Sequence, residues 1–197
     1  MKNPVVFGFY GKTNTGKTKL IEKIVEHLTQ DNYKVATIKK TDKKIGIDTE
    51  GKDTWKHTRA GAELVVFSSP VETDIIVKKN IPVKEIIQYI SEFGIYDVIL
   101  IEGATDPNIS KIRLGDIKER ENTILEYQNN FEEIIKLIKK EIELQPTTKN
   151  KINILVNGKA VPLSEFPASI IHNTIVGMVN SLKGVDKIEE IKIHLKN

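Results

Sequence analysis

Cysteine is absent from the 197-residue sequence, and arginine occurs only at Arg59, Arg113 and Arg120. The absence of cysteine excludes disulfides and thiolate metal sites, so a reducing cytoplasm is the expected location. The net charge is only +3, and no basic cluster is interleaved with aromatic residues. These features do not favour nucleic acid as a partner.

Long hydrophobic runs are also absent. No apolar run approaches the roughly 18 to 20 residues that a membrane helix requires, so no membrane partner is expected. The opening MKNPVVFGFYGKT does not resemble a secretory signal, because its apolar segment is short and runs into a Gly-Lys turn. The 39% hydrophobic share with mixed charges is typical of a globular core, with at most a small appendage.

Short apolar runs alternate with amphipathic segments through residues 1–144. Runs that are apolar on both faces are typical of strands buried in a parallel sheet. The strand candidates are residues 5–10, 34–39, 64–67, 74–79 and 98–101. The helix candidates, by the spacing of their apolar residues, are 20–28, 83–90 and 131–144. This alternation predicts a doubly wound α/β domain with a mainly parallel sheet.

The remaining sequence has a different pattern. Residues 115–130, GDIKERENTILEYQNN, fit no clear element. A polar, proline-containing stretch predicts a linker at 145–150 between a domain of residues 1–144 and a small appendage of residues 151–197. The appendage reads as β-β-α-β: a hairpin turning at Asn157-Gly158, a helix within 166–184, and an alternating strand at 188–195.

The first apolar run leads into GKTNTGKT, which matches the phosphate-binding loop pattern GxxxxGK(S/T). The motif lies between a predicted buried strand and a predicted amphipathic helix, as this kind of loop requires. It therefore predicts a P-loop that binds a nucleoside triphosphate. The predicted nucleotide-binding residues are Gly11, Lys12, Thr13, Asn14, Thr15, Gly16, Lys17 and Thr18.

The residue types of this loop suit polyphosphate chemistry. Backbone N–H groups can surround a phosphate only where no Cβ intervenes, and glycine permits the dihedral angles that aim them inward. The helix that begins near Gly16 adds free N–H groups and the positive end of its dipole. Lys17 is expected to contact the β- and γ-phosphates, and Thr18 is expected to bind Mg²⁺.

Two carboxylates flank the strand candidate at 98–101, and either could complete the Mg²⁺ site. Ligands bind beyond the carboxyl ends of parallel strands, and four residues at about 3.3 Å each separate the strand's ends by ~13 Å. Asp97 therefore lies at the wrong end, and Glu102 is the predicted metal residue. Gly103 would let the backbone approach phosphate closely. A solvated turn carboxylate is the alternative for Glu102.

The loop after the second strand candidate offers further polar residues. Asp48 and Asp53 could contact metal or water. Asp53 would open the next helix, so its carboxylate either caps that helix or binds metal, and both interpretations remain open. The possible anion contacts are Lys39, Lys40 and Lys52. In so lysine-rich a chain, any one of these lysines is more often solvated than functional.

Four segments of the sequence resemble the MobB family, the molybdopterin-guanine dinucleotide biosynthesis adaptor proteins. The resemblance covers about residues 4–114, in the family's order and spacing. The joint occurrence of GKD, AGA and EG is more specific than the P-loop alone. The segments are GKTNTGKT, IDTEGKDTWKHTRAGA, VILIEG and KIRL.

The resemblance implies a GTP-binding protein, similar to P-loop GTPases, that hydrolyses GTP slowly at best and is typically a homodimer. It implies a partner, the molybdenum cofactor nucleotidyltransferase that attaches GMP to molybdopterin. Carried over by motif, residues 11–18, Asp53 and Glu102 would hold the phosphates and Mg²⁺. Lys111 and Arg113 match a family stretch near the substrate or partner surface, although a solvated strand face is an equal alternative for both.

Two other functions fit the loop. A small-molecule kinase would use ATP and the same P-loop, but it should carry an arginine-rich lid, and residues 115–127 hold only Arg120. A metallocentre-assembly GTPase would usually carry His or Cys ligands. Fast hydrolysis needs an inserted charge such as an arginine finger, and only Arg59 lies in a loop segment near the nucleotide. No Asn-Lys-x-Asp guanine motif occurs, so the preference for guanine rests on the resemblance.

Overall fold

The computed structural model describes residues 4–145, 152, 154–156, 159–185, 188, 191–193 and 195. The chain divides into two compact units, Asn3–Leu144 and Gln145–Asn197. The predicted linker lies almost wholly outside the described residues, so the predicted domain limits stay a prediction.

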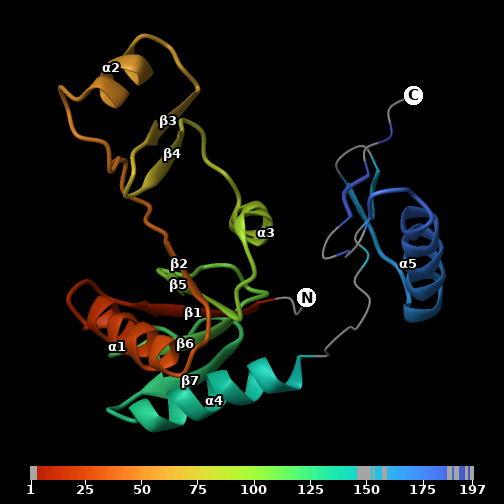
Figure 1. Ribbon diagram of the computed structural model, residues 1–197. Helices are drawn as coiled ribbons and strands as arrows, with labels where there is room; N and C mark the ends of the chain where they lie inside the picture. The colour runs from red at the N-terminus through yellow and green to blue at the C-terminus, as the bar shows by residue number, and fades with distance from the viewer. Residues whose placement is uncertain are drawn as a thin grey trace. The chain divides into compact units, whose positions relative to one another are not determined.

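Five parallel strands form the central sheet of the larger unit, in the order β2-β5-β1-β6-β7 (Figure 1). The central strand β1 pairs Phe9 with Glu102 on one side and with Ile112 on the other. Because all strands run in one direction, their carboxyl ends meet at a single edge, where the functional loops follow. The strands are β1 (Val5–Gly11), β2 (Val35–Lys39), β5 (Val98–Glu102), β6 (Ser110–Leu114) and β7 (Thr123–Tyr127).

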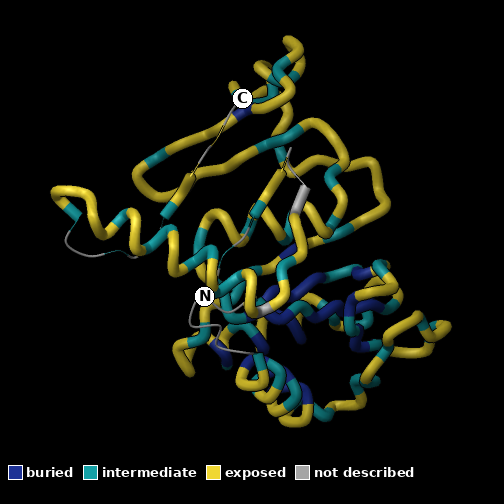
Figure 2. The backbone as a smooth tube through the Cα atoms, turned by 90° about the vertical axis from the view of Figure 1, so that its right-hand side faces the viewer, coloured by how far each residue is buried: buried dark blue, intermediate teal, exposed yellow. Residues whose placement is uncertain are grey.

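Helices cover both faces of this sheet, which confirms the predicted doubly wound α/β fold. On one face, α1 (Lys17–Gln30) and α4 (Phe131–Leu144) enclose the larger core. On the other face, α3 (Val83–Phe93) packs partly buried side chains against Ile99 and Ile101. Many of the residues drawn as buried in Figure 2 lie in the strands of the central sheet. Alternation along each strand produces the two cores, since successive side chains point to opposite faces.

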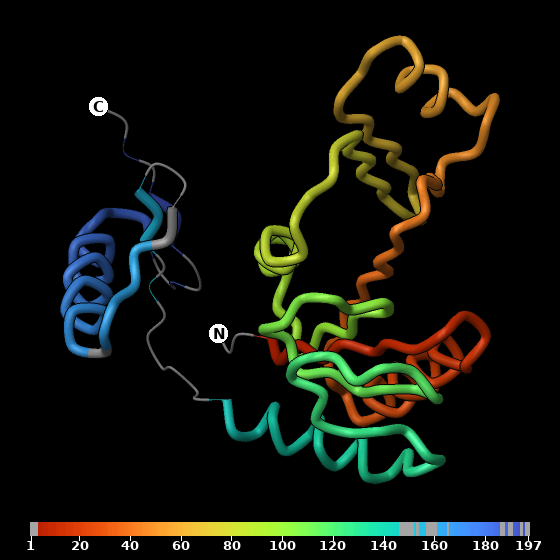
Figure 3. Tube along the Cα trace, turned by 180° about the vertical axis from the view of Figure 1, so that it is seen from behind, coloured from red at the N-terminus to blue at the C-terminus, as the bar shows by residue number. Residues whose placement is uncertain are grey.

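A segment that we call the arm contains α2 (Asp53–Arg59), β3 (Leu64–Ser68) and β4 (Thr73–Val77). These elements stand apart from the central sheet in both views of the chain (Figures 1 and 3). β3 and β4 pair antiparallel with each other and not with the central sheet.

The prediction that residues 64–67 form a strand buried in the parallel sheet is therefore wrong, whereas residues 74–79, predicted only as a strand, supply most of β4. Only residues 69–72 join the two strands, whereas a parallel connection needs about a dozen residues or more. The Ser69 hydroxyl accepts the backbone N–H groups of Val71 and Glu72 at 3.2 and 3.1 Å, which closes the hairpin turn. Apolar composition alone did not distinguish a hairpin from a buried strand.

The polar stretch 115–130, to which the sequence assigned no element, contains the edge strand β7. Asn122 and Asn129 flank this strand with positive φ angles of 55° and 64°. The strand, TILEY, mixes polar and apolar residues and none of them is fully buried, so it lacks the continuous apolar run that marked β5. The Tyr10 hydroxyl lies 2.7 Å from the Thr123 hydroxyl and ties the strand to β1.

The smaller unit contains an antiparallel hairpin of β8 (Ile154–Val156) and β9 (Lys159–Val161), followed by α5 (Glu165–Asn180). Its predicted turn at Asn157-Gly158 lies outside the described residues. Of the predicted strand at 188–195, the described residues 188, 191–193 and 195 form no strand. Within the described part of the chain, no helix is long and apolar enough to cross a membrane.

Candidate nucleotide-binding site

The loop of residues 11–16 connects β1 to α1 at the carboxyl edge of the sheet. A Cβ on Gly11 would lie 2.3 Å from the Leu114 carbonyl oxygen, so only glycine fits at that position. Gly16 has a φ of 84° and is the N-cap of α1 without a side-chain cap. The first N–H groups of the helix therefore remain available for an anion.

The Lys17 side chain folds back into this loop. Its Nζ donates to the carbonyl oxygens of Gly11, at 3.0 Å, and Lys12. The pKa of Lys17 is lowered, mainly because its side chain is partly buried. The negative charge of Glu102 opposes this shift, and the positive charge of Lys39 adds to it. The ammonium group thus lies where the loop would surround a phosphate.

Thr18 and Glu102 meet at the mouth of the loop. The Thr18 hydroxyl lies 3.2 Å from each Glu102 carboxylate oxygen. Glu102 also pairs with Lys39 at the end of β2, and its side chain is only 12% exposed. It is therefore not a solvated turn carboxylate. Asp97 lies at the opposite end of β5, where it accepts the Lys34 N–H at 2.7 Å.

This pair of side chains fits Mg²⁺. The ion prefers oxygen ligands and is usually held by one or two protein groups, phosphate oxygens and water. The hydroxyl of Thr18 and the carboxylate of Glu102 are such groups. Among the described residues there is no cluster of three or more His, Asp or Glu side chains that could hold a metal without a nucleotide.

Gly103 follows Glu102 directly and has a φ of 84°. A Cβ on this residue would lie 2.4 Å from the Lys40 carbonyl oxygen. The close approach that glycine permits here is therefore to the β2 chain, because the Lys40 N–H also bonds to the Glu102 carbonyl at 2.8 Å. The turn at Gly103 thereby fixes the position of Glu102 at the end of β5.

Asp53 and Lys52 are not brought to this site. Both lie at the start of α2 in the arm, where Lys52 is the N-cap (Figure 1). The Asp53 carboxylate is 85% exposed and pairs with Lys56 at 3.0 Å, which lowers the pKa of Asp53. Asp48 accepts a hydrogen bond from Thr54 at 2.8 Å. A role of Asp53 in metal binding stays a prediction.

Neither Lys111 nor Arg113 lies on a solvated strand face. Lys111 is completely buried, and its Nζ donates to the carbonyl oxygens of Ile109 and Glu121, each at 2.6 Å. Arg113 pairs with Glu126 at 2.7 Å, which raises the pKa of Arg113. Glu121 lies in the loop before β7 and Glu126 lies in β7 itself, and the sequence pattern placed neither the loop nor the strand.

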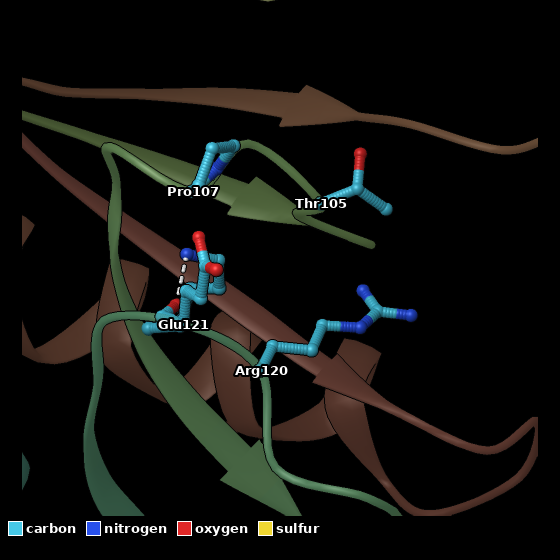
Figure 4. A pocket seen from close by; sticks show the side chains of 5 residues that line it. Thr105, Pro107, Arg120 and Glu121 are labelled. Atoms are coloured by element: carbon cyan, nitrogen blue, oxygen red, sulfur yellow. Dashed lines mark hydrogen bonds between the residues drawn. The ribbon is translucent and has the colours of Figure 1, made fainter.

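Two pockets adjoin these residues. One, of about 450 Å³, lies between α1 and β2 beside Thr18, Lys39 and Glu102. The other, of about 370 Å³, is lined by Thr105, Pro107, Lys111, Arg120 and Glu121 (Figure 4). Apart from Lys111, the sequence analysis assigned no site role to the lining residues of the second pocket.

Comparison with known proteins identifies the family. The model of the family MobB, molybdopterin guanine dinucleotide synthesis protein B, matches residues 6–140. A putative molybdopterin-guanine dinucleotide biosynthesis adapter protein of Methanocaldococcus jannaschii is 26% identical, over 96% of this chain and 97% of its own length. The Haemophilus influenzae adapter protein of the same name is 30% identical, over 58% of this chain and 65% of its own length.

The fold comparison agrees with this match. The crystal structure of Bacillus subtilis MobB is 18% identical and superposes with a TM-score of 0.55, over 70% of this chain and 97% of that one. At this identity the likeness bears on the fold alone. From the family match over residues 6–140, this chain belongs to the MobB, molybdopterin guanine dinucleotide synthesis protein B, family.

Proposed function

We propose that this protein is a GTP-binding adaptor in molybdopterin-guanine dinucleotide biosynthesis. The observation that carries the proposal is the meeting of Thr18 and Glu102 at the mouth of a P-loop, with Lys17 inside it. The names of the M. jannaschii and H. influenzae relatives supply the pathway. The family, not any single residue of this chain, supports guanine as the base.

Each residue of the loop has a distinct task in this proposal. The loop N–H groups and the Lys17 ammonium hold the β- and γ-phosphates. Thr18 and Glu102 hold the Mg²⁺ ion, which neutralises charge on the same phosphates when it is bound. Lys39 balances Glu102 and lies beside the position of the γ-phosphate.

Hydrolysis of GTP is slow in this proposal. The Arg59 guanidinium stacks on the Trp55 ring at 5.6 Å in the arm, and the arm stands apart from the loop (Figure 3). No arginine of the arm therefore adds a charge at the γ-phosphate, a contribution otherwise worth about 10³ to 10⁵ in rate. A bound triphosphate would persist long enough to act as a signal or a substrate.

The adaptor acts through a partner, the nucleotidyltransferase that joins GMP to molybdopterin. We also propose a homodimer formed through the arm. A two-stranded hairpin is marginally stable by itself, and β3 and β4 expose apolar side chains on both faces. A second copy of the same hairpin would bury them. The exposed residues are Leu64, Val66, Phe67 and Ile75.

The direct test is a titration of the protein with fluorescent GTP and ATP analogues, with and without Mg²⁺. We expect micromolar binding of GTP, weaker binding of ATP, and phosphate release far slower than once per second. Lys17→Ala should weaken binding at least tenfold, since hydrogen bonds to charged groups contribute about 1.5–3 kcal/mol. Lys19→Ala, which alters an exposed lysine of the same helix turn, is the matched control.

A second experiment tests the partner. The nucleotidyltransferase should co-purify with this protein when GTP and molybdopterin are present, and Lys17→Ala should reduce the yield. Rapid ATP turnover stimulated by a small acceptor would contradict the adaptor function, and so would failure to bind the nucleotidyltransferase under these conditions.

A further inference from the structure

A polar pocket lies on the face of the central sheet opposite α1, which we call the Lys111 pocket. Its lining residues are Thr105, Pro107, Lys111, Arg120 and Glu121. Ile112, the next residue along β6, belongs to the core beneath α1 and α4, so Lys111 points to the other face. This pocket is separate from the phosphate-binding loop and does not depend on the function proposed above.

Lys111 brings a buried charge to this pocket. Its side chain has no exposed surface, and the two hydrogen bonds of its Nζ are to backbone carbonyls rather than to carboxylates. An ammonium group has three donors, so one remains. Burying a charge is costly unless it is paired. Burial lowers the pKa of Lys111, while the nearby charges of Asp106 and Glu121 act to raise it. An anion at the remaining donor would add to this compensation.

The central strand is shaped to admit this lysine. Gly8 of β1 lies beneath the Lys111 side chain, and a Cβ there would be 3.2 Å from the Lys111 Cγ and 2.4 Å from the Ala104 Cβ. Glycine within a strand interior weakens the strand and often marks a close approach. The absence of a side chain at Gly8 therefore leaves room for the Lys111 side chain against the central strand β1.

Arg120 supplies a second cation in a fixed orientation. One guanidinium nitrogen donates to the Ala104 carbonyl at 2.6 Å, and the guanidinium carbon lies 4.8 Å from the Tyr10 ring centroid. The Tyr10 hydroxyl in turn accepts the Arg120 backbone N–H at 3.0 Å. Among the described residues, no carboxylate forms an ion pair with Arg120. Its remaining donors suit an oxyanion.

Thr105 lines the pocket, whereas Lys40 is not among its lining residues. The Thr105 hydroxyl bonds to the Lys40 ammonium, and the Arg120 side chain extends toward the side on which Thr105 lies (Figure 4). Two carboxylates are nearby. Asp106 already accepts two hydrogen bonds from Asn108, at 2.9 and 3.2 Å, and Glu121 is exposed to solvent. Neither carboxylate forms an ion pair with Lys111 or Arg120, so the donors that these two cations have left remain available to a ligand.

From this arrangement we propose that the Lys111 pocket binds the phosphate group of a phosphate monoester. Such a group carries close to two negative charges near neutral pH, which matches the charges of Lys111 and Arg120. A carboxylate carries one charge and has two acceptor oxygens rather than three, so it would satisfy fewer donors of Lys111 and Arg120. The ligand would bind at the same time as the nucleotide, since the two sites lie on opposite faces of the sheet.

The test uses glycerol 3-phosphate as the probe, with acetate for comparison, in calorimetric titrations of the full chain carrying Lys17→Ala. This background weakens phosphate binding by the loop. We expect saturable binding of glycerol 3-phosphate, no saturable binding of acetate, and an affinity at least tenfold lower after Arg120→Gln or Lys111→Met. Lys118→Gln, in the same exposed loop as Arg120, should leave the affinity within twofold.

Thermal melting separates loss of the pocket from loss of the fold. Lys111→Met removes the buried charge at similar volume and should not lower the melting temperature. If Arg120→Gln unfolds the protein, Thr105→Val is measured instead. Its affinity for glycerol 3-phosphate should be at least threefold lower. The proposal is overturned if glycerol 3-phosphate does not saturate the protein below 10 mM, or if Lys111→Met leaves its affinity unchanged. Binding of GTP by the protein with the wild-type loop is measured in a separate experiment. The proposed phosphate pocket and the proposed GTP site can therefore be contradicted independently of each other.

Discussion

The Thr18 hydroxyl lies 3.2 Å from both carboxylate oxygens of Glu102, although 84 residues separate the two in the sequence. The parallel pairing of β1 with β5 places Phe9 opposite Glu102, and α1 begins one residue before Thr18. Both side chains are thus held by regular elements rather than by loops. This arrangement preorganises the pair for a cation, since little further ordering is needed on binding.

Replacing Glu102 by Gln should reduce the effect of Mg²⁺ on nucleotide binding. The neutral amide retains the size of the side chain but loses the charge, and loss of a metal-supporting group typically costs about 10- to 100-fold in metal affinity. The measurement is the Mg²⁺ dependence of the dissociation constant of a fluorescent GTP analogue. Asp97→Asn, at the other end of the same strand, should leave that dependence unchanged.

In the proposed site Lys39 would compete with Mg²⁺ for Glu102, because its ammonium pairs with that carboxylate. Lys39→Gln should therefore raise the Mg²⁺ affinity of the complex with GDP by up to about fivefold, since a surface ion pair contributes up to about 1 kcal/mol. If Lys39 turns to the γ-phosphate, the same variant should weaken binding of GTP. Lys39→Arg retains the charge and should resemble the wild type. Equal Mg²⁺ affinity in all three proteins would contradict the competition.

Gly11→Ala should destabilise the larger unit and weaken nucleotide binding together. The added Cβ would lie 2.3 Å from the Leu114 carbonyl oxygen and 2.8 Å from the Thr15 hydroxyl, so backbone must move. Overpacking of this kind costs about 1–3 kcal/mol. Urea unfolding followed by circular dichroism measures the loss. Gly46→Ala, where a Cβ meets only the Asp48 N at 4.0 Å, should change the free energy of unfolding by less than about 0.5 kcal/mol.

The pair formed by Asp31 and Lys139, 2.7 Å apart, links the end of α1 to α4. The hydrogen bond from Lys139 lowers the pKa of Asp31, so the stabilisation is present above the unfolded pKa of about 3.9. It is lost as the pH falls through the lower pKa of the folded protein. Melting temperatures measured from pH 2 to 7 should show Asp31→Asn slightly less stable at pH 7, with the difference vanishing once the pH is below the lowered pKa of Asp31 in the folded protein. High salt should also reduce this difference in melting temperature at pH 7.

Val66→Lys should convert the proposed homodimer to a monomer, because a charge on the exposed face of β3 cannot be buried without cost. Sedimentation velocity at several protein concentrations measures the change. Glu72→Lys, in the turn of the same hairpin, alters charge without touching the apolar faces and should leave the dimer intact. A wild-type protein that sediments as a monomer at all concentrations would exclude this interface.

In the central sheet, β1, β2 and β5 and the covering helices were predictable, because each carries a local signal of apolar periodicity. β6 entered the sequence analysis only as the KIRL segment of the family resemblance, and β7 was not predicted. The arm was not predictable in the same way. Residues 64–67 are as apolar as those of β5, but four of the five residues of β3 are exposed, and the short link to β4 excludes a place in the parallel sheet. Burial depends on which partner a strand finds, and that is a property of the whole chain.

The sequence by itself determined the phosphate-binding loop, because glycine spacing, Lys17 and Thr18 act within eight consecutive residues. It also selected Glu102 over Asp97, since strand direction decides which end faces the ligand. Only the tertiary structure showed that Asp53 lies away from the loop and that Lys111 is buried beside Arg120. Those relations join residues from different elements, and no local pattern encodes the distance between them.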